Sequence, residues 1–77
     1  MKYSDGQPVI VGDTVTLGES VTGTVVCSID DRRGTSEFPI AEWEYLGRGI
    51  MVDSPQLGLL HIDAPDSDLV LVTRREI

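Results

Sequence analysis

The chain has 77 residues, of which 13 are acidic and six are basic, so its formal net charge is −7 with His61 neutral. A chain this short builds one small core and leaves little room for a deep substrate cleft, so we expect a single domain over residues 1–77. The excess of carboxylates argues against nucleic acid as a partner, because phosphate binding needs Lys and Arg. No apolar run approaches the roughly 20 residues of a membrane span. We therefore expect a cytoplasmic protein with no membrane partner.

The first part of the chain carries the period-two alternation of β-strands. Val15 and Leu17 alternate with threonines in residues 13–17, which predicts a half-buried strand. A second strand is expected over residues 21–29, where alternate positions form one apolar face: Val21, Gly23, Val25, Cys27 and Ile29. The glycine inside this strand predicts a bulge or a sharp bend at Gly23.

A long excursion over residues 30–48 then interrupts the strand pattern. Its first part is polar and rich in turn residues. Its second part, residues 39–46, predicts one or two helical turns that begin near Pro39. A loop of this length in a small domain is usually functional or mobile.

Three more strands are expected, over residues 49–53, 57–62 and 69–72, and a polar tail follows from Arg74 to Ile77. The first two of these strands should pair as a hairpin. The last strand is apolar on both faces, which predicts that the excursion or another chain covers its outer face. A homodimer that forms through an exposed strand edge is one such arrangement.

Five short strands with one long loop between the second and third predict an all-β fold. The architecture that fits best is a small five-stranded SH3-like barrel, with a short helix in the loop. An OB-fold is the alternative, although OB-folds are usually longer and often carry a helix after the third strand.

No arrangement of residues predicts catalysis, a cofactor or a metal site. Cys27 and His61 form the only Cys–His pair, and Cys27 lies on an apolar face where free Cys is usually a core residue. One Cys and one His also cannot build a zinc site within one chain. Asp63, Asp66 and Asp68 lack the central Gly and closing Glu of a calcium loop. We therefore do not expect an enzyme.

The sequence Glu42-Trp43-Glu44-Tyr45 is the strongest candidate for a binding site, because Trp and Tyr are enriched at interaction hot spots. Its carboxylates suit Lys or Arg on a partner protein. Trp43 is either an anchor for that partner or a part of the core. The protein-binding residues that we predict in the excursion are Asp30, Asp31, Glu37, Glu42, Trp43, Glu44 and Tyr45.

Several motifs resemble known small barrels. Val-Gly-Asp-Thr-Val (residues 11–15) followed by Thr-Gly-Thr-Val-Val (residues 22–26) is similar to the opening of SH3-like and KOW-type barrels. Small bacterial proteins that are often associated with toxin loci resemble the chain over most of its length, at Lys2–Val9, Val26–Asp30, Glu42–Leu46 and Pro65–Leu69. This resemblance implies an immunity protein that binds and neutralises a cognate basic toxin. A general adaptor or regulatory module in a larger protein complex is the alternative.

Overall fold

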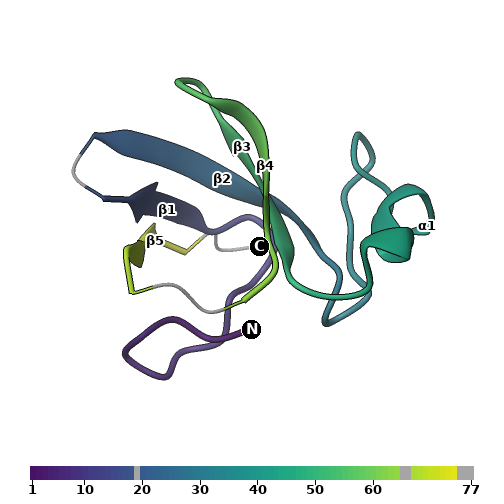
Figure 1. Cartoon of the computed structure of the whole chain (residues 1–77), viewed down its shortest axis with the longest axis horizontal. Helices are drawn as coiled ribbons and strands as arrows, with labels where there is room; N and C mark the ends of the chain where they lie inside the picture. Colours follow the sequence, from purple (N-terminus) through teal and green to yellow (C-terminus); the bar gives the residue numbers. More distant parts are fainter. Residues whose placement is uncertain (19, 65–66, 75–77) are drawn as a thin grey trace.

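A computed structural model describes residues 1–18, 20–64 and 67–74 of the chain. Its elements are β1 (Thr14–Leu17), β2 (Val21–Ser28), α1 (Ile40–Trp43), the 3₁₀ turn η1 (Glu44–Leu46), β3 (Ile50–Ser54), β4 (Gly58–Ile62) and β5 (Leu69–Thr73). The five strands form one antiparallel sheet in the order β4-β3-β2-β1-β5 (Figure 1). The predicted all-β class, the five strands and the β3–β4 hairpin are confirmed. The sheet is not closed, and β4 and β5 are its edges.

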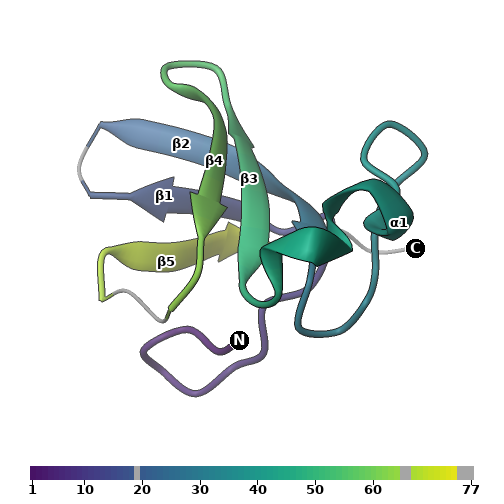
Figure 2. The same cartoon turned by 45° about the vertical axis from the view of Figure 1, so that its right-hand side comes forward.

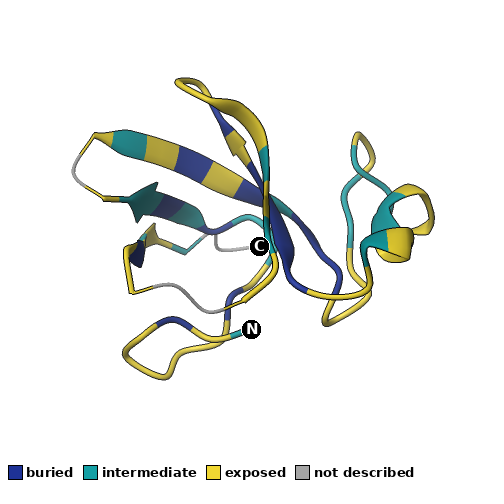
Figure 3. Ribbon diagram, in the orientation of Figure 1, coloured by how far each residue is buried: buried dark blue, intermediate teal, exposed yellow. Residues whose placement is uncertain are grey.

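The main core lies on one face of this sheet and is closed by the N-terminal hairpin, residues 1–9. Three backbone hydrogen bonds hold that hairpin. Tyr3 donates to the Gln7 carbonyl oxygen and Val9 to the Met1 carbonyl oxygen, both over 2.9 Å, and Gly6 donates to the Tyr3 carbonyl oxygen over 3.0 Å. The alternation of buried and exposed residues is visible along β2 in Figure 3. The fully or almost fully buried members of the core are Tyr3, Val9, Val15, Val25, Ile50, Val52 and Leu69.

A bulge in β2 changes the face on which Cys27 lies. Val25 pairs with Val52 of β3, but Cys27 pairs with the adjacent Met51, so Val26 is an extra residue in the ladder. Paired residues share a face, whereas neighbours along a strand point to opposite faces. The prediction that Val25 and Cys27 share one face is therefore wrong.

The bulge also lies away from its predicted position at Gly23, which pairs regularly with Val15. A Cβ atom at Gly23 would collide with the Val52 side chain and approach the Asp53 carbonyl oxygen to 3.0 Å. Glycine is needed here because strands β2 and β3 approach each other closely.

The residues displaced by the bulge form a second, smaller core beneath the excursion. Cys27, Ile29 and Met51 are its buried members. The half-buried side chains that cover them come from β2 and the excursion: Val26, Phe38, Ile40, Trp43 and Leu46. The predicted helical turn thus packs on the sheet through Ile40, Trp43 and Leu46. Figure 2 shows α1 and its flanking loops beside one end of the sheet.

Cys27 is expected to react slowly with thiol reagents in the native protein. Its side chain is fully buried, and burial raises the pKa of the thiol, so both access and thiolate formation are suppressed. Labelling by a chromogenic disulfide reagent should follow global unfolding and accelerate sharply in urea. Rapid labelling without denaturant would contradict the burial of Cys27.

The excursion does not cover the outer face of β5. Of the two covers that the sequence predicted, the excursion or another chain, the first is therefore wrong. Val70 and Val72 are 49% and 53% exposed. The excursion packs instead on the second core around Cys27. Residues 75–77 of the predicted polar tail lie outside the described residues, as does Asp66.

Candidate functional site

The excursion is a lobe whose base is closed by Gly49. The Gly49 carbonyl oxygen accepts hydrogen bonds from the backbone amides of Ile29 (2.9 Å) and Asp30 (3.3 Å). The Gly49 amide donates in turn to Asp30 Oδ1 over 3.1 Å. Further along, the Thr35 hydroxyl donates to the Val26 carbonyl oxygen over 3.2 Å. The lobe is therefore attached to the sheet at both its base and its middle, and α1 projects beyond the sheet (Figure 1).

An aromatic cluster runs from the second core to the surface of this lobe. The Trp43 ring lies 6.3 Å from the Phe38 ring and 6.5 Å from the Tyr45 ring, with interplanar angles of 39° and 26°. Trp43 is half-buried, whereas Tyr45 is 75% exposed. Trp43 therefore supports the lobe from within, and Tyr45 presents aromatic surface to solvent.

The Trp43 indole also carries a buried polar atom. Its Nε1 atom has no hydrogen-bond partner within the described part of the chain. A buried donor without a partner costs free energy. Some of the packing stabilisation of Trp43 is therefore offset.

The seven predicted binding residues divide into two groups. Asp30 and Asp31 lie at the base of the lobe, where Asp30 pairs with the Met1 amino group at 3.0 Å and Asp31 accepts a 3.3 Å hydrogen bond from the Ser28 hydroxyl. These two carboxylates hold the fold locally. The others lie on the lobe itself: Glu37, Glu42, Trp43, Glu44 and Tyr45.

Consecutive positions on α1 and η1 bring Glu42, Glu44 and Tyr45 to the surface together, and all three are exposed. The excursion also contains three arginines, so the net charge of residues 30–48 is −2, from five carboxylates and three guanidinium groups. The surface around Tyr45 can therefore offer carboxylates to a cationic partner, while Asp30 and Asp31 are used inside the fold.

A buried charge centre around Asp13 was not predicted from the sequence. Asp13 is fully buried, and its Oδ2 accepts hydrogen bonds from the Tyr3 hydroxyl (2.6 Å) and the Ile10 amide (3.0 Å). Arg74 Nε donates to Asp13 Oδ1 over 3.1 Å, and Arg74 Nη2 donates to the Pro8 carbonyl oxygen over 2.7 Å. Arg74, which the sequence assigned to a polar tail, instead ties the end of β5 to Asp13, just before β1, and to Pro8 of the N-terminal hairpin. No local pattern connects positions 13 and 74, so only the fold reveals this centre.

Acid should destabilise the protein below about pH 4, because two structural carboxyls have lowered pKa values. Burial alone would raise the pKa of Asp13, but hydrogen bonds from Arg74, Tyr3 and the Ile10 amide outweigh it and hold the pKa below 3.8. The Gly49 amide is the main cause of the lowered pKa of Asp30.

A carboxyl whose pKa is lower in the folded state stabilises the fold above its unfolded pKa, and this contribution disappears as the pH falls through the folded pKa. Urea unfolding at several pH values between neutrality and pH 2 should show this loss. In the Asp13→Asn variant, the free energy of unfolding should fall less steeply as the pH decreases. A free energy of unfolding that is constant down to pH 3 would contradict this assignment.

Comparison with known protein families, curated proteins and solved structures finds no match for the chain. Among residues 1–18, 20–64 and 67–74, no cluster of three His, Cys, Asp or Glu side chains is placed to hold a metal ion. None of the helices in this part of the chain is long and apolar enough to cross a membrane. The candidate site therefore rests on the geometry of the lobe.

Proposed function

We propose that the protein is a non-catalytic module that binds a basic protein through the excursion lobe. The observation that carries the proposal is the exposure of Tyr45, which stacks on the supporting Trp43 and is flanked by two exposed carboxylates. A rigidly supported aromatic ring beside charged groups is the composition of an interaction hot spot. Glu42 and Glu44 would meet Lys or Arg of the partner at the rim of this contact.

Electrostatics favour the same kind of partner. The net charge of −7 attracts a cationic protein over long range and accelerates encounter with it. Such steering would be weakened by salt, so the association rate should fall as ionic strength rises. A partner held mainly by apolar contacts would show little of this dependence.

We also propose that the sheet is an open version of an SH3-like barrel. The return of β5 to pair with β1, beside the meander from β1 to β4, supports this proposal. In such a fold, the five strands are a scaffold and the long β2–β3 excursion carries recognition.

The specific function that we propose is immunity: the bound partner is a bacterial toxin, and the lobe blocks its active site or its access to substrate. The similarity of the sequence motifs to toxin-associated proteins and the acidic surface support this interpretation. We place the complex in the cytoplasm, where the lone Cys27 would stay reduced.

Photo-crosslinking tests the proposal while the partner is still unidentified. A benzophenone amino acid replaces Tyr45 in one variant and Leu57 in a control variant. Leu57 is 59% exposed, in the turn between β3 and β4, away from the lobe (Figure 1). We expect the probe at position 45 to capture one basic protein from the source cells, and the control to capture little of it.

Expression of the captured protein should then harm cells unless this chain is present. Stronger capture of the same protein from position 57 would contradict the binding surface. A captured protein whose activity is unaffected by this chain would contradict immunity and would favour the adaptor function.

A further inference from the structure

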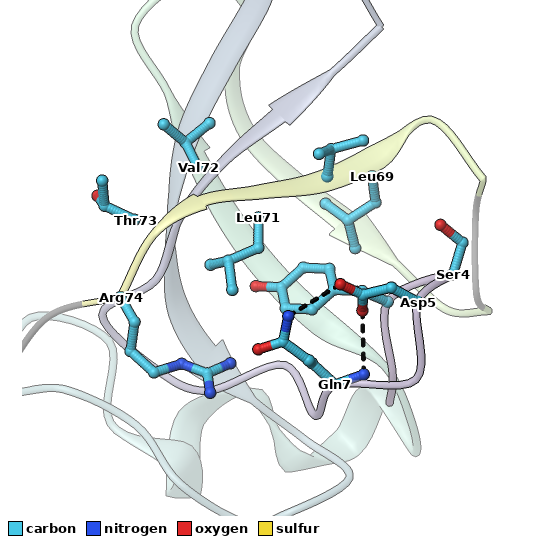
Figure 4. A pocket seen from close by; sticks show the side chains of 10 residues that line it. Ser4, Asp5, Gln7, Leu69, Leu71, Val72, Thr73 and Arg74 are labelled. Atoms are coloured by element: carbon cyan, nitrogen blue, oxygen red, sulfur yellow. Dashed lines mark hydrogen bonds between the residues drawn. The ribbon is translucent and has the colours of Figure 1, made fainter.

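A groove separates β5 from the N-terminal hairpin (Figure 4), and no residue of the excursion is among those that line it. Its volume is about 370 Å³. One wall is the hairpin, which contributes Tyr3, Ser4, Asp5 and Gln7, and the other wall is residues 69–74.

The second wall is the backbone edge of β5. Successive side chains of a strand point to opposite faces, so a groove that contacts every residue from 69 to 74 must run along the edge of the strand. The other edge of β5 pairs with β1, and no strand in the described part of the chain pairs with the edge that faces the groove. An unpaired edge offers backbone N–H and C=O groups to an added strand. The pairing with β1 becomes irregular near Thr73, so the regular part of the edge is Leu69–Leu71.

The charge of the groove selects among the extended chains that could enter it. Arg74 is paired with buried Asp13, so its charge is already compensated. Asp5 accepts hydrogen bonds from two neutral donors of Gln7, the backbone amide at 3.0 Å and Nε2 at 2.8 Å (Figure 4). The described residues place no cation within salt-bridge distance of Asp5. The hydrogen bonds from Gln7 are the main cause of the lowered pKa of Asp5, and Arg74 is close enough to lower it further. The charge of Arg74 is shared with Asp13, however, so the two carboxylates and one guanidinium group leave a net charge of −1 at this wall.

Apolar surface lies on the other side of the edge. Val70 and Val72 are about half exposed. In Figure 4, Leu71 and Arg74 point toward the hairpin, whereas Val72 points away from it. A strand added here would place alternate side chains near Asp5 and near the two valines.

We propose that this groove binds an extended cationic segment of a partner protein, which adds a sixth strand to the free edge of β5. The segment alternates basic residues, directed to Asp5, with apolar residues that pack on Val70 and Val72. The site is separate from the excursion lobe and does not depend on the function assigned to that lobe. A second copy of this chain is a poorer occupant, because each copy carries a net charge of −7.

Nuclear magnetic resonance tests this proposal with a defined probe, an acetylated and amidated peptide of alternating lysine and valine. We expect the peptide to shift the backbone amide signals of Leu69–Leu71 and to slow their hydrogen exchange. A peptide with glutamate in place of lysine should not bind. Two further peptides carry N-methyl groups on the odd-numbered or on the even-numbered residues. Only one of them should lose binding, because only one of these two sets of amides faces β5.

Two matched variants isolate the charge of Asp5. Asp5→Asn keeps an oxygen for the Gln7 amide but removes the charge. It should lower the affinity for the lysine peptide by about two- to fivefold. Asp53→Asn makes the same change of charge at an exposed position on β3, outside both proposed binding surfaces, and should leave the affinity unchanged. The proposal is overturned if the β5 signals do not move, if the glutamate peptide binds equally well, or if both variants have the same effect. Slow exchange of the β5 edge in a dimer of the free protein would overturn it in favour of a second copy.

Discussion

Asp13→Ala is expected to lower the free energy of unfolding by roughly 2–4 kcal/mol, because the buried Asp13 carboxylate accepts several hydrogen bonds and pairs with the partly exposed Arg74. The substitution leaves the Tyr3 hydroxyl and the Ile10 amide without their acceptor, and Arg74 without its counter-ion. A domain of this size has a total stability of about 5–15 kcal/mol, so this one side chain accounts for a large share. Urea unfolding followed by Trp43 fluorescence measures the loss.

Tyr3→Phe is the matched control for this network. It deletes one hydrogen bond to Asp13 and keeps the aromatic ring in the main core, so we expect a loss of about 1 kcal/mol. The decisive result is which of the two variants loses more free energy of unfolding. If Asp13→Ala costs no more than Tyr3→Phe, Asp13 is not the centre that joins β1, β5 and the hairpin.

Gly49→Ala is the second change with a large expected effect, roughly 2–5 kcal/mol from backbone strain and overpacking together. Gly49 has a φ of +96°, and a Cβ atom there would collide with the Ile62 carbonyl oxygen and lie 2.7 Å from Asp63 Cα. Both obstacles are backbone atoms, which cannot move aside cheaply. The base of the lobe would have to open to accommodate the methyl group.

Gly47→Ala separates strain from collision. Gly47 has a similar φ of +86°, but nothing lies within 4 Å of its added Cβ. The Gly47→Ala variant should lose only about 1–2 kcal/mol of stability, which is the cost of placing alanine in the left-handed conformation. Equal losses of stability in the two variants would show that the contact between Gly49 and β4 does not constrain the lobe.

The sequence predicted those parts of the fold that depend on local pattern. Alternation of Val and Thr indicated β1 and β2, and Pro39 indicated the start of the helical turn. The bulge at Val26 could not be foreseen, because a bulge depends on how β2 pairs with β3 and no residue type marks it. One extra residue moved Cys27 to the opposite face and created the second core.

The candidate site was predictable to a similar degree. Aromatic and acidic residues that are consecutive in the sequence stay together on a short helix, so the grouping of Glu42, Glu44 and Tyr45 followed from local structure. The structural roles of Asp30 and Asp13 depend on Gly49 and Arg74, which are 19 and 61 residues away. Local sequence patterns cannot identify partners at such separations.

The affinity of a charge-reversed lobe for the crosslinked partner tests the central claim most directly. Glu42→Lys/Glu44→Lys reverses the two carboxylates that precede Tyr45. Asp53→Lys/Pro55→Lys/Leu57→Lys makes the same change of net charge at exposed positions of the β3–β4 hairpin, away from the lobe. Calorimetric titration measures the affinity of each folded variant for the partner. The comparison separates the loss of local contacts from the effect of the overall net charge. We predict a loss of at least about 30-fold for the lobe variant, from roughly 2 kcal/mol or more of broken and repulsive charge pairs, and a much smaller loss for the control. Equal affinities for the two variants would contradict the assignment of the lobe as the binding surface.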